Sequence, residues 1–125
     1  MDQCDVIVVE GAGGLMSPVS EEDFIADLVV EFGYPAVIVT SNVIGAINQT
    51  LQTLITASCF RDGIDVAGVV LNDARSIDGD ISMNSNRDEI SKRSARPVLT
   101  RLQYEQDEFD DTIDWMQVIK DSQSI

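Results

Sequence analysis

Short, almost continuous runs of β-branched residues alternate along the chain with segments whose apolar residues recur at helical spacing. The runs at 4–9, 36–40 and 66–71 are typical of strands that are buried on both faces of a parallel sheet. A shorter run, Pro97-Val98-Leu99, is expected to begin a fourth strand. The pattern therefore predicts βαβ units, and so an α/β fold with a parallel sheet and helices on both of its faces.

Helical spacing is found in the segments that follow the strands. The first helix is expected to have Ser20 as its N-cap residue and to end at Gly33. Residues 74–86 are polar and rich in turn-forming residues, so we expect a surface loop there. Three further helices are expected, in segments 47–58, 87–93 and 113–119.

The size and composition are those of a small globular protein. The chain has 125 residues, of which 44% are hydrophobic and 24% are charged. These values are ordinary for a folded domain, and the length suits one domain rather than two. We therefore expect residues 1–125 to form a single α/β domain.

Acidic residues dominate the charge. The formal net charge is −14, from 22 acids and 8 bases, and there is no His. This balance disfavours binding to nucleic acid or to an anionic membrane, and the lack of His excludes a Ser-His-Asp triad or a His-ligated zinc site within this chain. Residues 1–60 carry eight acids and no base. An anion bound there has to be held by backbone N–H groups, by a metal ion or by another segment.

Features of the termini and cysteines predict a cytoplasmic location. No apolar run approaches the roughly 18 residues that are needed to span a membrane, and the first residues lack the basic region of a signal peptide. Cys4 and Cys59 stand in apolar surroundings without a CxxC spacing. We expect both to be buried free thiols, as is usual in a reducing cytosol.

Polar or glycine-rich segments follow three of the predicted strands, at Glu10–Gly14, Ser41–Asn48 and Asn72-Asp73. Ligands of parallel α/β sheets collect at the carboxyl ends of the strands. At the first of these segments, small residues allow backbone N–H groups to approach an anion, and the Glu10 carboxylate could hold Mg²⁺. The alternative is a tight turn whose Glu points to water, because the segment matches neither GxGxxG nor GxxxxGK[ST].

The other two segments also have two interpretations. Gly45-Ala46-Ile47-Asn48 begins the second helix, where free N–H groups suit a carboxylate or a phosphate; the alternative is an ordinary glycine entry to a helix. The amide of Asn72 offers a donor and an acceptor to an adenine edge, although Asn-Asp is also a common turn pair.

Taken together, these segments resemble dethiobiotin synthase. Residues 5–14 followed by Pro18 resemble the VEGAGG segment of that family, and residues 43–51 resemble its GLGTINHTLLT segment. Gly68-Val-Val-Leu-Asn72 resembles its strand that ends in Asn, while Asn86-Arg-Asp-Glu-Ile and Pro97-Val-Leu resemble a later helix and strand. The resemblance implies a P-loop NTPase-like, Rossmann-like three-layer fold that lacks the first P-loop strand.

The same resemblance implies an ATP- and Mg²⁺-dependent ligase of biotin biosynthesis, which closes 7,8-diaminononanoate and CO₂ into the cyclic urea of dethiobiotin. By position, Glu10 would bind Mg²⁺, and Asn72 would bind the adenine. The phosphate and substrate cleft would be lined by Gly11, Ala12 and Gly13. The substrate carboxylate would be held across a homodimer interface by Gly45, Ala46, Ile47 and Asn48.

Several residues depart from the family pattern. The chain resembles the C-terminal portion of the enzyme, without the P-loop and its Lys, and Gln49 stands where the family has His. Thr100-Arg101-Leu102-Gln103 replaces a Gly-x-Ile/Val-Pro segment. Like charges about 4 Å apart repel by roughly 4 kcal/mol at an effective dielectric constant near 20. Without the Lys residues of the family, the Glu10 carboxylate would therefore repel phosphate, and we expect the isolated chain to bind Mg·ATP weakly or not at all.

The alternative functions are a non-catalytic remnant or dimerisation module, or a fragment of a related P-loop amidoligase.

Overall fold

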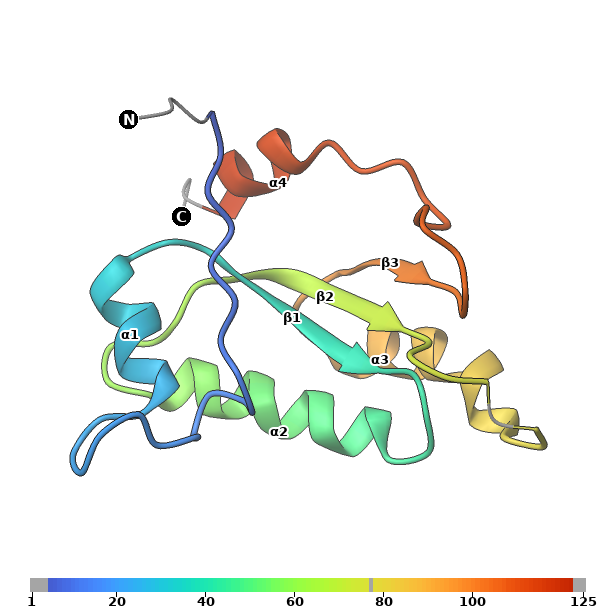
Figure 1. Cartoon of the computed structure of the whole chain (residues 1–125), viewed down its shortest axis with the longest axis horizontal. Coiled ribbons are helices and arrows are strands. Elements are labelled where there is room, and N and C mark those ends of the chain that lie inside the picture. Colours follow the sequence, from blue (N-terminus) through green and yellow to red (C-terminus); the bar gives the residue numbers. More distant parts are fainter. Residues whose placement is uncertain (1–4, 77, 123–125) are drawn as a thin grey trace.

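Three parallel strands form the centre of the fold (Figure 1). The structure is a computed structural model that describes residues 5–76 and 78–122. The strands are β1 (Ala36–Ser41), β2 (Val66–Asn72) and β3 (Val98–Leu102), in the order β1-β2-β3, and both neighbouring pairs are parallel. This arrangement confirms the predicted α/β fold with a parallel sheet.

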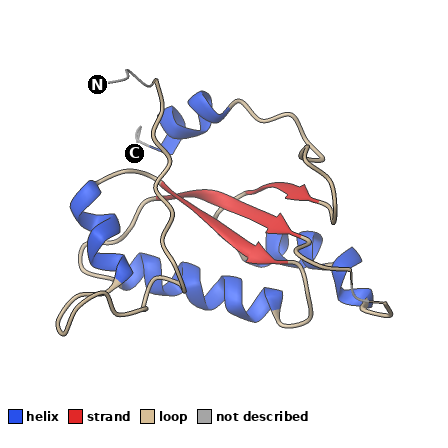
Figure 2. Ribbon diagram, viewed as in Figure 1, coloured by secondary structure: helices blue, strands red, loops and turns tan. Residues whose placement is uncertain are grey.

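Helices cover both faces of the sheet, as Figure 2 shows. The helix α2 lies against β1 on one side, together with α3, and α4 lies against β2 on the other side. The three-layer arrangement predicted from the strand–helix alternation is therefore present. The helices are α1 (Ile25–Phe32), α2 (Ala46–Cys59), α3 (Asn86–Arg93) and α4 (Trp115–Ser122), with one turn of 3₁₀ helix, η1 (Ile81–Asn84).

Small and branched side chains fill the space between α1, α2 and the sheet. Four buried residues form this core, which partly buried apolar side chains surround: Ala26, Ala57, Ile64 and Val66. Alanines at these helix positions let the helices approach the strands closely. The middle of β2 is buried on both faces, as its continuous apolar sequence predicts, and Val69 and Leu71 are both 0% exposed.

The beginning of α1 differs from the prediction, because Ser20 is not its N-cap residue. The Ser20 hydroxyl accepts the N–H groups of Glu22 and Asp23 at 3.2 and 3.0 Å, which stabilises a separate turn. The helix begins one turn later, where the Phe24 N–H donates to the Asp27 carboxylate at 2.8 Å. The predicted end is correct: Gly33 has a φ of 66° and donates its N–H to the carbonyl of Val29.

The strand predicted at 4–9 is wrong for the part that the structure describes. Residues 5–10 belong to no strand, and Val6 to Val9 are 52 to 88% exposed. Residue 4 lies outside the described residues. A strand requires a neighbour for its N–H and C=O groups, and within residues 5–76 and 78–122 no strand pairs with this run.

Other predictions are corrected in detail. Cys59 is exposed rather than buried, because it lies on the outer face of α2 near its end, and Cys4 lies outside the described residues. The loop predicted at 74–86 contains η1, and its last residue already belongs to α3. The last helix begins at Trp115, whose ring packs against Phe109 with centroids 5.7 Å apart. No helix in the described part of the chain is long and apolar enough to cross a bilayer.

Gly68 provides a test of the contact between β2 and β3. A Cβ atom at this position would lie 2.6 Å from Cγ of Leu99 and 2.9 Å from the carbonyl oxygen of Pro97. We expect Gly68→Ala to lower the free energy of unfolding by about 1–3 kcal/mol, as overpacking does, in urea titrations. Adding Leu99→Ala should recover part of this loss; strictly additive effects would contradict the close approach.

Asp27 provides a test by pH. Its hydrogen bond from the Phe24 N–H and its contact with Arg61 lower the pKa of its carboxyl below 3.8. A lowered folded-state pKa adds stability above about pH 4, and this stability is lost as the pH falls through the folded-state value. Asp27→Asn should therefore destabilise the protein at about pH 7 and have little effect at about pH 2, in urea unfolding at both values. Glu31→Gln, on the same helix, is the control, and an equal loss at both pH values would contradict the prediction.

Candidate functional site

The carboxyl ends of β1 and β2 lie side by side. Ser41 is opposite Asn72 in the sheet register, and the Asn42 N–H donates to the carbonyl of Asn72 at 2.9 Å. The predicted segments Ser41–Asn48 and Asn72-Asp73 therefore meet at one edge of the sheet. The helix α2 begins four residues after Asn42, so its first turn belongs to the same edge.

The first turn of α2 presents backbone donors. Gly45 precedes the helix with a φ of 91°, a left-handed conformation that favours glycine. Ala46 is fully buried and donates its N–H to the carbonyl of Val43 at 3.1 Å. The next two residues, Ile47 and Asn48, also stand in the first turn, where N–H groups have no acceptor one helical turn earlier. This geometry is compatible with the predicted carboxylate site.

A buried carboxylate lies directly beside Asn72. The Asp73 side chain is 4% exposed, and that of Arg101 is 23% exposed. The Arg101 guanidinium donates to both carboxylate oxygens of Asp73, from Nε at 3.1 and 3.0 Å and from Nη2 at 2.5 Å. The hydrogen bond to Asp73 raises the pKa of Arg101, although burial acts in the opposite direction. The pair joins the end of β2 to β3.

Two buried asparagines extend this network to β1 and α3. Asn42 donates from Nδ2 to Asp73 at 2.8 Å and to the carbonyl of Met83 at 3.1 Å. Asn86, the first residue of α3, donates to Oδ1 of Asn42 and to the carbonyl of Val43, both at 3.0 Å. Asn42 and Asn86 are 0 and 1% exposed. The loop between β1 and α2 is thereby fixed by the side chains of Asp73 and Asn86 and by the carbonyl of Met83.

These buried polar residues were not among the site residues predicted from the sequence. Asp73 and Asn42 lie in two of the polar segments that were predicted to follow strands, Asn72-Asp73 and Ser41–Asn48, but neither residue was assigned a role. Asn86 and Arg101 lie outside these segments, and their sequence context does not distinguish them from surface residues. Their partners are distant in the sequence, and only the folded chain brings them together.

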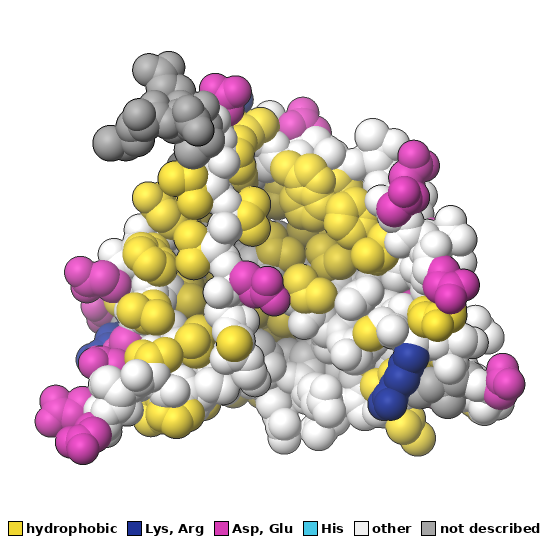
Figure 3. Space-filling model, viewed as in Figure 1, with side chains coloured by type: hydrophobic (Ala, Val, Ile, Leu, Met, Phe, Trp, Pro, Cys, Tyr) yellow, Lys and Arg dark blue, Asp and Glu magenta, His cyan; other side chains and the backbone are white. Residues whose placement is uncertain are grey.

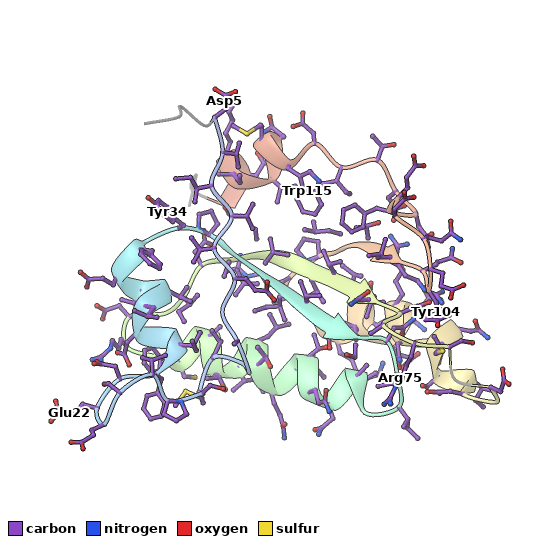
Figure 4. The ribbon with its side chains drawn as sticks, in the orientation of Figure 1. Asp5, Glu22, Tyr34, Arg75, Tyr104 and Trp115 are labelled. Carbon is purple, nitrogen blue, oxygen red and sulfur yellow. The ribbon has the colours of Figure 1, made fainter. Side chains whose placement is uncertain are left out.

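Charged groups of both signs stand near the start of α2. The Asp80 carboxylate accepts the Ile44 N–H at 3.1 Å. Its pKa is lowered, chiefly by the hydrogen bond from the Ser82 hydroxyl and also by the backbone N–H groups of Ser82 and Ile44. Arg75, which follows β2, lies at the same edge of the sheet (Figure 4). The Ile44 N–H is thus already hydrogen-bonded to Asp80 and is not available to a ligand, whereas Arg75 contributes a positive charge at this edge.

The glycine-rich turn lies against a different part of α2. Residues Gly13 to Pro18 and four side chains of the helix line a pocket of about 540 Å³, to which α2 contributes Gln49, Gln52, Thr53 and Thr56. Gly13 has a φ of 90°, and a Cβ atom there would lie 2.4 Å from the Ser17 hydroxyl. Neither Gly45 nor Asn72 lines this pocket. The structure thus places the turn beside α2 but not beside the Asn72 edge.

Glu10, Gly11 and Ala12, the first residues of the predicted segment Glu10–Gly14, are exposed and do not line this pocket. In the part of the chain that the structure describes, no group of three or more His, Cys, Asp or Glu residues could hold a metal ion. One carboxylate nevertheless suits Mg²⁺, which proteins commonly hold through one or two carboxylates together with substrate phosphates and water. The role of Glu10 as a magnesium ligand stays a prediction.

The parallel sheet, with polar loops gathered at its carboxyl edge, is the arrangement of α/β nucleotide-binding proteins. The AAA_26 family model, described as an AAA domain, matches residues 1–109. The chain belongs to this family and is dethiobiotin synthase-like, as the sequence motifs predicted.

Several relatives carry the name ATP-dependent dethiobiotin synthetase BioD. The protein from Anaeromyxobacter dehalogenans (strain 2CP-1) is 38% identical over 101 residues, which are 81% of this chain and 44% of the relative. The proteins from Thermodesulfovibrio yellowstonii and Bacillus licheniformis are 33 and 37% identical, over 80 and 78% of this chain and 44 and 40% of their own lengths. The chain thus spans less than half the length of these curated relatives.

Removing the buried charge of Asp73 tests the network. Asp73→Asn replaces charge-assisted hydrogen bonds with neutral ones and leaves Arg101 without its counterion. We expect the free energy of unfolding to fall by about 2 kcal/mol or more, measured by urea titration.

The control removes the same charge from an exposed pair. Asp111 pairs with Arg87, and both side chains are more than one third exposed, so Asp111→Asn should cost less than about 1 kcal/mol. Equal losses in the free energy of unfolding for the two variants would contradict the prediction that the buried Asp73–Arg101 pair contributes more to stability than the exposed pair.

Proposed function

We propose that this chain supplies the glycine turn, the α2 helix and the adenine-side Asn of an ATP- and Mg²⁺-dependent dethiobiotin synthetase. The observation that carries the proposal is the junction of β1 and β2, where the Asn42 N–H donates to the Asn72 carbonyl at 2.9 Å and α2 begins beside it. The names of the BioD relatives support the activity. The reaction belongs to biotin biosynthesis, and the proposal locates it in the cytoplasm.

Each predicted residue has a role in binding. Asn72 accepts and donates hydrogen bonds at the adenine edge, with its backbone held by Asn42. The N–H groups at the start of α2, from Gly45 to Asn48, bind the carboxylate of 7,8-diaminononanoate. They do so across a homodimer interface. The small residues Gly11, Ala12 and Gly13 line the cleft for phosphate and substrate, and Glu10 holds Mg²⁺, which neutralises phosphate charge.

The proposed reaction has three balanced steps. One amine of 7,8-diaminononanoate adds to CO₂ and loses a proton, giving a carbamate. A carbamate oxygen then attacks the γ-phosphorus of ATP, and ADP leaves. The second amine then attacks the carbamoyl carbon and loses a proton, which closes the cyclic urea and releases phosphate. Such phosphoryl chemistry depends mainly on positioning and on neutralisation of charge, and the residues of this chain would contribute the positioning.

The experiment combines this chain with the remainder of an enzyme of the family. The chain is mixed with a separately expressed polypeptide that comprises the part of the Anaeromyxobacter dehalogenans relative outside its match. We expect ATP-dependent formation of dethiobiotin from 7,8-diaminononanoate and CO₂ in the mixture only. Isothermal titration of the isolated chain should show no micromolar affinity for Mg·ATP. If the mixture forms a complex yet produces no dethiobiotin, the chain is a non-catalytic remnant or dimerisation module, or belongs to another amidoligase.

Two substitutions test the assigned roles in the active mixture. Glu10→Gln should lower the Mg²⁺-dependent kcat by about a hundredfold, while Glu21→Gln, at another exposed acid, should not. Asn72→Ala should lower the preference for ATP over GTP by about fivefold, since a lost hydrogen bond to the base costs of the order of 1 kcal/mol; Asn84→Ala is its control. Wild-type rates for Glu10→Gln, or an unchanged preference for Asn72→Ala, would remove that residue from the mechanism.

A further inference from the structure

Asn72 and Asp73 point to opposite faces of the sheet. The Asp73 N–H donates to the carbonyl of Leu102 at 2.9 Å, so the ladder between β2 and β3 continues through Asp73. Successive side chains of such a strand alternate between its two faces. The Asp73 carboxylate accepts from Asn42, which in turn accepts from Asn86 of α3, so Asp73 lies on the face that α3 covers. The side chain of Asn72 is therefore directed to the other face, on which α4 lies.

The face to which Asn72 is directed is open and apolar. Val70 stands two residues earlier on the same face, opposite Val39 of β1 in the sheet register, and Val39 is 64% exposed. Figure 3 shows hydrophobic side chains gathered on this side of the sheet, where the surface is hollowed. Asn72 is half-buried at the end of this face. An apolar wall with a polar group at its end is the usual composition of a site for a small organic ligand.

The Asn72 side-chain amide has no hydrogen-bond partner among residues 5–76 and 78–122, whereas its backbone is held. The Asn72 carbonyl accepts the Asn42 N–H at 2.9 Å. The direction of the amide therefore depends on the backbone at the end of β2. That backbone is in turn fixed by the next side chain, the Asp73 carboxylate, which is 4% exposed.

Arg101 fixes Asp73 in orientation as well as in position. Its guanidinium donates to both carboxylate oxygens, from Nε at 3.1 and 3.0 Å and from Nη2 at 2.5 Å, while Asn42 donates to one of these oxygens at 2.8 Å. A planar guanidinium that engages both oxygens restricts rotation of the carboxylate more than a single point charge does. A twist of the last residues of β2 would break these bonds, so Arg101 also restricts the rotation of Asn72.

We propose that Arg101 is a positioning residue, which directs the Asn72 amide so that the site distinguishes adenine from guanine. The proposal rests on the proposed function, in which Asn72 binds the base. An amide pairs with adenine through one donor and one acceptor, whereas guanine presents two acceptors at the same edge. This difference is read only when the amide is held in one orientation, because a freely turning amide can offer its donor to either base. Arg101 acts through Asp73, on the opposite face of the sheet, and does not itself contact the base.

The alternative role of the Asp73–Arg101 pair is a contribution to stability alone. Removing a pair with that role would lower the free energy of unfolding without changing the folded end of β2 or the choice of base. Removing a positioning pair would also lower the order of the Asn72 backbone and the preference for adenine. Measurements on folded protein therefore separate the two roles.

The first test measures nitrogen-15 relaxation of the backbone amides in the full chain, under conditions in which each variant is folded by circular dichroism. Arg101→Met removes the paired guanidinium and keeps an unbranched apolar side chain. We expect the order parameters of Asn72 and Asp73 to fall from about 0.85 towards the value of about 0.6 that marks flexible backbone. The control is Arg87→Met, which breaks the exposed pair with Asp111 and should leave both values unchanged. Unchanged order at Asn72 in folded Arg101→Met would overturn the proposal.

Arg101→Lys provides a second variant in case Arg101→Met does not fold. It keeps a positive charge beside the buried Asp73, but an ammonium lacks the planar fork that engages both carboxylate oxygens. We therefore expect Arg101→Lys to fold and to lower the order parameter of Asn72 by a smaller amount. Wild-type order at Asn72 in this variant would also overturn the proposal, because a point charge would then be sufficient.

The second test measures base preference in the active mixture. Arg101→Met should lower the ratio of kcat/KM for ATP to that for GTP by about fivefold, as Asn72→Ala does, through a higher KM for ATP at an unchanged kcat. Combining the two substitutions should lower the ratio no further, because both remove the same contact with the base. A further fivefold fall in the double variant would show that Arg101 acts independently of Asn72 and would overturn the proposal. Arg87→Met is again the control.

The two tests separate this proposal from the proposed function. An inactive mixture would contradict the proposed function, whereas the relaxation measurement would still decide whether Arg101 positions Asn72. An active mixture in which Asn72→Ala lowers the preference for ATP and Arg101→Met does not would overturn only the role of Arg101.

Discussion

The buried carboxylate of Asp73 is the constraint on which the carboxyl edge of the sheet depends. A carboxylate that is 96% removed from water is costly unless its oxygens are hydrogen-bonded and its charge is paired. Arg101 on β3 and Asn42 after β1 meet both needs. Since each donor comes from a different segment, satisfying one carboxylate fixes the ends of all three strands. Asn72 and the start of α2 are held in place as a consequence.

The proposed function requires this acidic chain to bind anions at the same edge. With a net charge of −14, its general field repels phosphate and carboxylate groups. Attraction has to come from local donors, such as the N–H groups in the first turn of α2 and the guanidinium of Arg75. Asp80 acts against them, because its carboxylate already accepts the Ile44 N–H. Attraction and repulsion of an anion at the start of α2 are therefore nearly equal. This agrees with the proposal that other parts of the enzyme contribute cationic groups to the site.

The sequence predicted the elements whose reasons are local. Continuous β-branched runs predicted the positions of β1 and β2. Gly33 predicted the end of α1, because the residue that ends a helix often has a left-handed conformation, which favours glycine, and Gly33 has a φ of 66°. The meeting of Asn72 with the loop before α2 also followed, since parallel strands share a carboxyl edge. The network of Asp73, Arg101 and two asparagines could not be predicted, because its bonds join residues 28 to 44 positions apart. The exposure of residues 5–9 could not be predicted for a related reason. The pattern of apolar residues indicates the propensity for a strand, whereas strand pairing depends on a neighbour that is distant in the sequence.

Among the described residues, the two candidate regions are joined through α2. Its first turn stands beside Asn72, while the glycine turn lies one turn further along, against Gln49 and Thr53. In the proposed function, the adenine site at Asn72 and the phosphate cleft at Gly13 are therefore related by this helix. Its position depends on Thr50, buried against Thr40 with their hydroxyls 3.2 Å apart, and on the loop fixed by Asn42 and Asn86. The strand β1 thus positions α2 through its inner face, on which Thr40 lies.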